Sequence, residues 1–207
     1  MKYTSKHIED AVEAFSMLPS IGKKSALRLV LYLLQQEPEK SDKLSASIKQ
    51  LHTMVKSCKV CNAYSDHDIC MICADQSRNR RQVCVVESIR DMMAIEDTQQ
   101  YNGTYHVLGG LISPLDGIGP DDIHIDQLLE RVKEDSVEEI IMAIPPSIEG
   151  ETTIFYINKQ LKGQSVQISV IARGVSFSGD LEYTDEITLG RSLVSRMPYK
   201  GQTMNGE

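Results

Sequence analysis

The sequence contains no tryptophan and only 3 phenylalanines among its 207 residues, so any core must use aliphatic side chains, methionine and tyrosine. It also contains no apolar run approaching about 18 residues, which argues against a membrane-spanning helix. The N-terminal segment lacks the apolar stretch of a signal peptide, so we expect a cytoplasmic protein with no membrane partner. In that reducing compartment, metal binding explains the 5 cysteines better than disulfides do.

Positive charge is scarce in the second part of the chain. Residues 1–81 contain 13 Lys and Arg against 9 Asp and Glu, whereas residues 82–207 contain 9 against 20. An acidic protein is a poor general binder of nucleic acid, because attraction to phosphates needs local positive charge. A basic first part can still hold DNA by one face. Chance drift in composition gives the same asymmetry, so the motifs must decide.

Apolar spacing predicts helices first and alternating strands and helices afterwards. The helical segments at the start of the chain are 5–18, 23–36 and 41–55. Runs rich in β-branched residues predict strands at 83–86, 105–108, 139–144 and 166–172. The helices between and after these strands are 88–96, 123–132, 152–161 and 189–196. This order indicates a multidomain α/β protein in which a helical bundle precedes a mainly parallel sheet covered on both faces.

A tight turn, Leu-Pro-Ser-Ile-Gly at 18–22, joins the first two helices and resembles a helix–hairpin–helix DNA-binding motif. A turn that leads into a helix leaves backbone N–H groups open to a phosphate. The expected DNA-binding residues are Gly22, Lys23, Lys24 and Arg28. Contacts of this kind are independent of base sequence. Ser20 stands where the motif usually has glycine, and its Cβ restricts the turn; the alternative is a hairpin that only packs, with solvated lysines.

Four of the cysteines form two Cys-x-x-Cys pairs within sixteen residues: Cys58, Cys61, Cys70 and Cys73. Four thiolates make a closed tetrahedral zinc site, so we expect one structural zinc ion per chain. The loop should then depend on metal for its fold, with the α/β region largely spared. A disulfide, free thiols and an iron–sulfur cluster are the alternatives. His67 is read as a solvated loop residue, and Cys84 as a buried core thiol.

The second half of the chain, with its alternating strands and helices, resembles a Toprim domain. It lacks some of the carboxylates that catalytic Toprim domains carry. Catalytic Toprim members carry a Glu at the end of the first strand and an Asp-x-Asp-x-Glu-Gly-Glu stretch later, which together hold Mg²⁺. Here the later stretch has Pro145 and Ser147 at the aspartate positions. The remaining acids are Glu87, Asp91, Glu149 and Glu151. Three interpretations stay open for them: a surface that binds a protein partner, a solvated acidic patch and a weak metal site.

The order of these modules resembles the RecR family of bacterial recombination mediators over nearly the whole chain. The most distinctive stretches are Tyr-His-Val-Leu-Gly-Gly at 105–110, Ser-Pro-Leu-Asp-Gly-Ile-Gly-Pro at 113–120 and Leu-Glu-Tyr-Thr-Asp at 181–185. The resemblance implies a non-enzymatic protein that acts with RecO and RecF in recombinational repair and helps load recombinase on gapped or single-stranded DNA. It also implies a homo-oligomer, either a dimer or a tetrameric ring, that associates with the nucleoid during repair.

The resemblance divides the chain into four parts. They are a helix–hairpin–helix region (1–56), a four-cysteine zinc module (57–74), a Toprim-like domain (80–175) and a tail that serves as an oligomer contact (176–207). Ser176 and Ser178 replace the Pro and Gly of the family's usual Gly-x-Pro-x-Gly turn. A second hypothesis is a small Toprim nuclease that uses the residual carboxylates with Mg²⁺.

Overall fold

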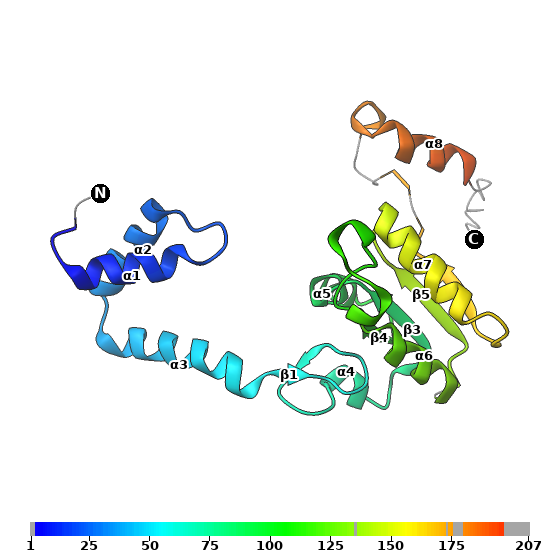
Figure 1. Cartoon of the computed structure of the whole chain (residues 1–207), viewed down its shortest axis with the longest axis horizontal. Coiled ribbons are helices and arrows are strands. Elements are labelled where there is room, and N and C mark those ends of the chain that lie inside the picture. The colour runs from blue at the N-terminus through cyan, green and yellow to red at the C-terminus, as the bar shows by residue number, and fades with distance from the viewer. Residues whose placement is uncertain (1–2, 135, 173, 176–179, 197–207) are drawn as a thin grey trace, which may run out of the picture. The chain divides into compact units, whose positions relative to one another are not determined.

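The computed structural model describes residues 3–134, 136–172, 174–175 and 180–196 (Figure 1). Ser176 and Ser178, for which the sequence predicts an altered turn, lie outside the described residues. The chain forms two compact units, residues 1–56 with 65–67 and residues 57–64 with 68–207. Among the described helices, none combines the length and apolar character needed to cross a bilayer.

The first unit contains the three helices that the apolar spacing predicts. They are α1 (Lys6–Ser16), α2 (Lys23–Leu34) and α3 (Pro38–Met54). Helices α1 and α2 pack around a core of only three buried side chains: Val12, Ala26 and Val30. No residue of α3 is buried. The first unit therefore has little core of its own.

The cysteine segment folds into short elements that the apolar spacing does not predict. Strands β1 (Lys56–Ser57) and β2 (Tyr64–Ser65) pair with each other, and helix α4 (Met71–Ala74) follows them. Elements this short carry too few residues to show a helical or strand period. Their positions depend on the cysteines instead.

The second unit contains a four-stranded parallel sheet in the order β4-β3-β5-β6. Its strands are β3 (Asn79–Val86), β4 (Gly103–Val107), β5 (Glu139–Ala143) and β6 (Gln167–Val170). Val86 of the first strand pairs with both Val107 and Ala143, so the three strands end at one level. Strand β3 is followed along the chain by β4, which lies on one side of it in the sheet, and then by β5, which lies on its other side. In open α/β sheets, functional sites gather at this type of crossing point, outside the carboxyl ends of the strands.

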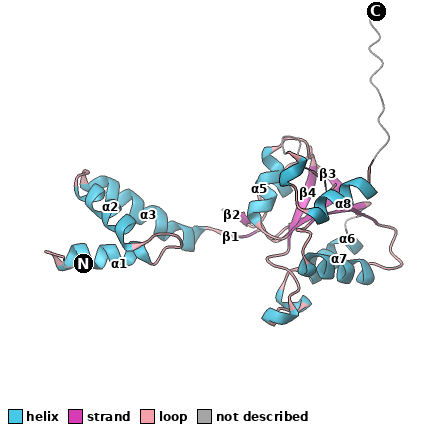
Figure 2. Ribbon diagram, turned by 90° about the horizontal axis from the view of Figure 1, so that it is seen from above, coloured by secondary structure: helices cyan, strands magenta, loops and turns pink. Residues whose placement is uncertain are grey.

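The two faces of the sheet are covered by different kinds of structure (Figure 2). Val83 and Val85 point to one face and contact the core formed with α6 (Ile125–Glu134) and α7 (Ile148–Gln160). Cys84 and Val86 point to the other face, where α5 (Ile89–Asp97) and the cysteine segment cover them. The predicted parallel sheet with two covered faces is confirmed, but part of one cover is the cysteine segment and not a helix.

The connections at the carboxyl end of the sheet are ordered loops. They include the single-turn helices η1 (Pro114–Asp116) and η2 (Pro120–Asp122). Helix α7 begins at Ile148, four residues before the predicted start, because Ser147 caps it. Near the end of the described chain lie η3 (Leu181–Tyr183) and α8 (Glu186–Val194).

Candidate functional site

The four paired cysteines lie together in the second unit, all buried, with their sulfur atoms within 4.8 Å of one another. Cys61 Sγ and Cys70 Sγ are 3.6 Å apart. A tetrahedral zinc ion with Zn–S bonds of about 2.3 Å separates its sulfur ligands by about 3.8 Å, whereas a disulfide needs about 2.05 Å. The spacing fits a zinc ion and does not fit a disulfide. His67 is exposed and is not a member of the cluster.

Backbone turns aim the sulfur atoms at one point. The Cys58 N–H donates to the Ala63 carbonyl at 2.8 Å, and the Asn62 N–H donates to the Cys58 carbonyl at 3.0 Å. Asn62 closes this turn with φ +61, a left-handed conformation that asparagine tolerates better than most residues. The Cys70 N–H donates to Cys58 Sγ at 3.3 Å, and the Cys73 N–H donates to Cys70 Sγ at 3.4 Å. Such bonds stabilise thiolate sulfur.

The sulfur atoms of Cys61, Cys70 and Cys73 are close enough to shift one another's pKa values in opposite directions. Hydrogen bonds from Cys61 and Cys73 lower the pKa of Cys70. The hydrogen bond between Cys61 and Cys70 raises the pKa of Cys61, because it stabilises the protonated thiol of Cys61. A divalent cation would remove the difference between the cysteine pKa values, because it stabilises all four thiolates at once. Cys84, the fifth cysteine, lies outside the cluster, and burial raises its pKa to about 12. It behaves as the core thiol that the sequence predicts.

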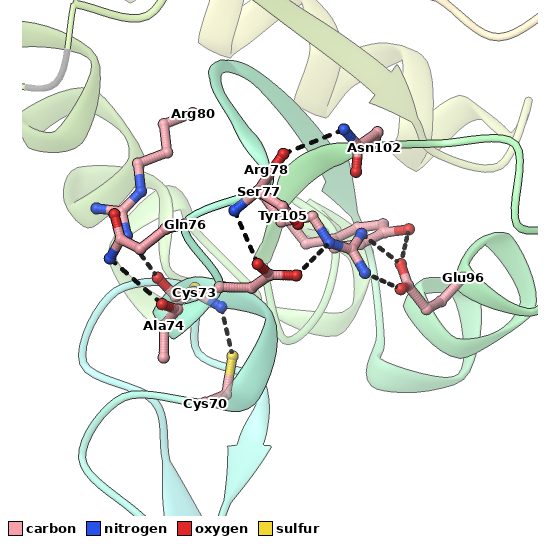
Figure 3. A network of polar contacts seen from close by, with 11 residues as sticks. Cys70, Cys73, Ala74, Gln76, Ser77, Arg78, Arg80, Glu96, Asn102 and Tyr105 are labelled. Carbon is pink, nitrogen blue, oxygen red and sulfur yellow. Dashed lines mark hydrogen bonds and ion pairs between the residues drawn. The ribbon is translucent and has the colours of Figure 1, made fainter.

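The cysteine segment is bonded to the edge of the sheet. The Val107 N–H of β4 donates to the Cys61 carbonyl at 2.8 Å. Arg80 of β3 donates to the Cys73 carbonyl at 3.1 Å (Figure 3). The cluster sulfurs also share one apolar core with Cys84 and Val86. The metal site is therefore part of the structure of the α/β unit.

A second polar network lies beside that junction (Figure 3). Arg78 donates to the Glu96 carboxylate at 3.0 Å and forms an ion pair with Asp75 at 3.7 Å. The Tyr105 hydroxyl donates to the same carboxylate at 2.8 Å. Arg78 lowers the pKa of Glu96, because its guanidinium stabilises the ionised form. The network joins the segment after α4 to α5 and β4.

The predicted DNA-binding residues surround the start of α2. Gly22 is the N-cap residue, no side chain caps the helix, and the space where a Cβ would stand at Gly22 is open. Lys23, Lys24 and Arg28 are exposed. Ser20 has φ +65, the left-handed conformation that glycine adopts without strain. The structure thus brings basic side chains and uncapped backbone together, in a turn that keeps the geometry of the motif.

Two of the predicted acids follow β3. Burial raises the pKa of Glu87, and the negative charge of Asp91 raises it further. Asp91 accepts hydrogen bonds from the Ser88 N–H at 3.0 Å and the Ser88 hydroxyl at 2.7 Å. The bond from the Ser88 N–H to Asp91 is part of a capping box at the start of α5. Asp91 therefore has a structural role in addition to its charge.

The other two acids lie in the first turn of α7, after the neighbouring strand β5. The Gly150 N–H donates to Ser147 Oγ at 3.1 Å, so the serine at an aspartate position of the Toprim pattern serves as a helix cap. A side chain at residue 150 would overlap the Pro145 carbonyl, which explains the glycine between Glu149 and Glu151. Asp116, from the loop after β4, places negative charge beside Glu149. Sequence analysis missed this fifth acid, because the loop has no strand or helix period.

Two buried polar residues were also missed. His106 of β4 is fully buried, and its Nε2 donates to the His124 carbonyl at 2.7 Å. Burial lowers the pKa of His106 to about 4. Arg131 of α6 is 8% exposed and donates to the Tyr105 carbonyl at 2.7 Å and to Thr104 Oγ1 at 2.6 Å. The hydrogen bonds of both residues involve β4. No pattern in the surrounding sequence indicates that either side chain is buried.

Family comparisons match four consecutive parts of the chain. The matching family models are RecR helix-hairpin-helix (8–52), RecR four-cysteine zinc finger (55–75), Toprim domain (81–172) and RecR C-terminal (174–197). The chain is thus a modular protein that combines a helix–hairpin–helix, a four-cysteine zinc finger and a Toprim domain. The zinc site that the cysteine spacing predicts is confirmed by this match and by the sulfur geometry.

Comparison with curated proteins over nearly their full length identifies the family of this chain. The chain is 51% identical over 199 residues to "Recombination protein RecR" of Amoebophilus asiaticus, covering 96% of this chain and 100% of that protein. It is 52% identical over 200 residues to the protein of the same name from Bacteroides fragilis, covering 97% and 98%. The chain belongs to the RecR family. The resemblance predicted from the sequence is confirmed.

Proposed function

We propose that the chain is a non-enzymatic, DNA-binding mediator of recombinational DNA repair. In this proposal it acts with RecO- and RecF-type partners to help load recombinase on gapped or single-stranded DNA, in the cytoplasm and at the nucleoid. The names of its relatives support a role in recombination. The observation that carries DNA binding is the uncapped, basic start of α2.

The helix start offers two attractions to a phosphate group. Its first N–H groups have no side-chain cap, and the helix dipole favours an anion there. Its first turn contains no acidic residue. Lys24 and Arg28 are four residues apart and lie on one face of the helix. The site suits the backbone of DNA and carries no means of reading bases.

The test is the double substitution of Lys24→Ala with Arg28→Ala. Affinity for single- and double-stranded DNA should fall about equally for all sequences, and the slope of log K against log salt should fall by roughly two, near one for each lost contact. Fluorescence anisotropy across a salt series measures both. The matched control is Lys40→Ala with Lys43→Ala on α3, which should change the slope little. An unchanged slope in the first variant, with normal circular dichroism, would assign DNA binding to another surface.

Catalysis is not part of the proposal, because the Toprim pattern lacks carboxylates at Pro145 and Ser147. Ser147 is engaged as a helix cap. Phosphoryl transfer with Mg²⁺ needs acids that neutralise charge on the transferring group. The competing hypothesis, a small Toprim nuclease, predicts cleavage of DNA with Mg²⁺ or Mn²⁺ that is lost in Glu149→Ala with Glu151→Ala. Such cleavage would overturn the mediator proposal.

The residual acids serve instead as a partner-binding surface in this proposal. Glu87 and Asp91 follow β3, and Glu149 and Glu151 follow the adjacent β5, so all four belong to the carboxyl end of the sheet. Negative charge there repels DNA and attracts a basic protein, which gains association rate from the attraction. A RecO-type protein is the proposed partner.

The proposal also includes a homo-oligomer, a dimer or a tetrameric ring. Apolar side chains of α3 repeat at helical spacing and are 40–62% exposed: Leu44, Ile48, Leu51 and Met54. Exposed apolar stripes of this kind mark association surfaces. Several basic helices around one opening would concentrate positive potential in a protein whose net charge is −7.

A further inference from the structure

A rigid loop at the carboxyl end of the sheet displays one aliphatic side chain almost completely to solvent. The Ser113 and Ile118 backbones exchange two hydrogen bonds of 3.0 and 2.9 Å. The Ser113 hydroxyl donates to Asp116 at 2.6 Å, and the Asp116 N–H donates to the Ser113 carbonyl at 3.1 Å. Leu115 lies at the tip of this loop and is 97% exposed. The loop therefore holds an apolar side chain outward in a fixed position.

The loop is attached to the start of α7 (Figure 1, the green loop beside the yellow helix). The Ile112 N–H donates to Thr153 Oγ1 at 2.9 Å, and the same hydroxyl donates to the Glu149 carbonyl at 2.7 Å. Ile148, the first residue of α7, is 82% exposed. The two exposed aliphatic side chains, Leu115 and Ile148, thus belong to a loop and a helix start that are hydrogen-bonded to each other.

Negative charge flanks both side chains. Asp116 follows Leu115, and Glu149 follows Ile148. The hydrogen bonds of the α7 N-terminus lower the pKa of Glu149, while the nearby charge of Asp116 opposes that shift. The two carboxylates are therefore close enough to interact. The junction thus combines apolar contact area with a local negative potential.

We propose that Leu115, Asp116, Ile148 and Glu149, here called the Leu115/Ile148 surface, bind a basic segment of a protein partner that packs apolar side chains against the two aliphatic residues. This proposal rests on the partner-binding role proposed above and adds the residues that hold the partner once it has arrived. Charge complementarity selects a basic segment and disfavours nucleic acid, whose phosphates the carboxylates repel.

The two kinds of side chain should act on different rate constants. Rim charges steer encounter, so they change the association rate and its salt dependence. Buried aliphatic anchors change the dissociation rate, because they act only after desolvation. The rigidity of the loop favours such a role, since little conformational freedom is lost when the partner binds.

The experiment uses the full chain and the RecO-type protein of the same genome as the probe, with surface plasmon resonance at several salt concentrations. Leu115→Ala and Ile148→Ala should each raise the dissociation rate roughly tenfold and leave the salt dependence unchanged. Leu115→Met and Ile148→Met should retain most of the affinity. Leu34→Ala at the end of α2, where the leucine is 64% exposed, is the matched control and should have no effect.

A parallel arm separates this proposal from the one it rests on. Glu149→Ala with Glu151→Ala should lower the association rate and flatten its salt dependence. If the acidic variant has this effect and Leu115→Ala with Ile148→Ala does not, the Leu115/Ile148 surface is refuted and the partner role stands. If neither variant has an effect, both proposals fail. A change in oligomeric mass on light scattering in the aliphatic variants would assign the surface to contact between copies and would also overturn the proposal.

Discussion

The two compact units of this chain are stabilised in different ways. The helical unit has three buried side chains between α1 and α2, and none in α3. The α/β unit has two apolar cores, one on each face of its sheet, and a four-sulfur cluster inside one of them. Apolar burial contributes about 25 cal/mol per Å² of area, so the α/β unit gains far more from its own contacts. The helical unit keeps apolar area exposed, including Ile48 and Leu51 of α3.

The two units also differ in where their charged and polar side chains lie. The α2 start has basic, exposed side chains and a strained Ser20, whereas the α/β unit buries His106 and Arg131. Exposed charges contribute little to folding, so the helical unit can dedicate them to binding. Buried polar groups contribute only when they are hydrogen-bonded; His106 Nε2 and the Arg131 guanidinium are bonded, whereas the buried His106 Nδ1 has no hydrogen-bond partner among the described residues.

The largest effect should come from Cys61→Ser. Zinc content should fall from about one ion per chain to near none, and the α/β unit should lose more than about 4 kcal/mol of unfolding free energy. The loss extends beyond the loop, because Cys61 shares a core with Cys84 and Val86 and binds Val107. This differs from the local effect that the cysteine spacing alone predicts. Metal analysis and hydrogen exchange of β3 and β4 measure the two results.

Cys84→Ser is the matched control for the metal site. It removes an equally buried thiol that lies outside the cluster, so zinc content should stay at about one ion per chain. Amides of α1 and α2 should keep their exchange rates in both variants. Equal loss of zinc from the two variants would contradict the assignment of the ligands.

An intermediate effect should follow from acidification. His106 is neutral in the folded protein, where burial lowers its pKa to about 4, and it has a pKa near 6.5 when unfolded. Its contribution to stability is complete above the unfolded value and is lost as the pH falls from 6.5 toward 4. Between pH 7 and pH 5 the folded state should lose about 2 kcal/mol on this account. Urea unfolding followed by circular dichroism measures the loss.

His106→Gln isolates this contribution, because glutamine keeps an N–H donor for the His124 carbonyl and does not titrate. The variant and the parent chain share the cysteine site, so acid effects on the metal cancel in the difference. The parent should lose about 2 kcal/mol more than the variant. Parallel pH curves for the two chains would refute the role of His106.

The smallest effect should come from Ser20→Gly in the helical unit. Serine at φ +65 is strained and glycine is not, so the substitution should stabilise the hairpin by about 0.5–1 kcal/mol. Slower hydrogen exchange in α1 and α2 would show it. Ser20→Ala keeps the Cβ and should give no gain. A gain with alanine equal to that with glycine would show that backbone strain is not the cause.

Much of this architecture could be predicted from the sequence, because its signals are local. The three first helices follow apolar spacing, and the parallel strands are short β-branched runs such as residues 83–86. The zinc ligands follow from two Cys-x-x-Cys pairs, because the spacing itself forms the site. The sequence predicts that Ser20 restricts the turn, and its positive φ agrees.

What could not be predicted depends on tertiary contacts. Arg131 has the spacing of an ordinary helical residue, and only the β4 backbone that it binds explains its burial. Apolar spacing predicts the start of α7 four residues too late, because polar residues such as Ser147 and Glu149 are typical of a loop. The bond from the Gly150 N–H to Ser147 Oγ, which caps the helix, is visible only in the structure. Asp116 reaches Glu149 only because Ile112 is bonded to Thr153.

The bond from the Val107 N–H to the Cys61 carbonyl has a further consequence. Strand β4 is an edge strand, and an open edge offers unpaired backbone groups to any other extended chain. The cysteine segment binds one backbone N–H of β4, while Arg131 of α6 binds the Tyr105 carbonyl of the same strand. Chelation should therefore free the carboxyl end of β4 as well as loosen a loop, and it should open that end to strand pairing with another chain. Zinc-depleted protein should thus aggregate more readily than zinc-loaded protein at the same concentration.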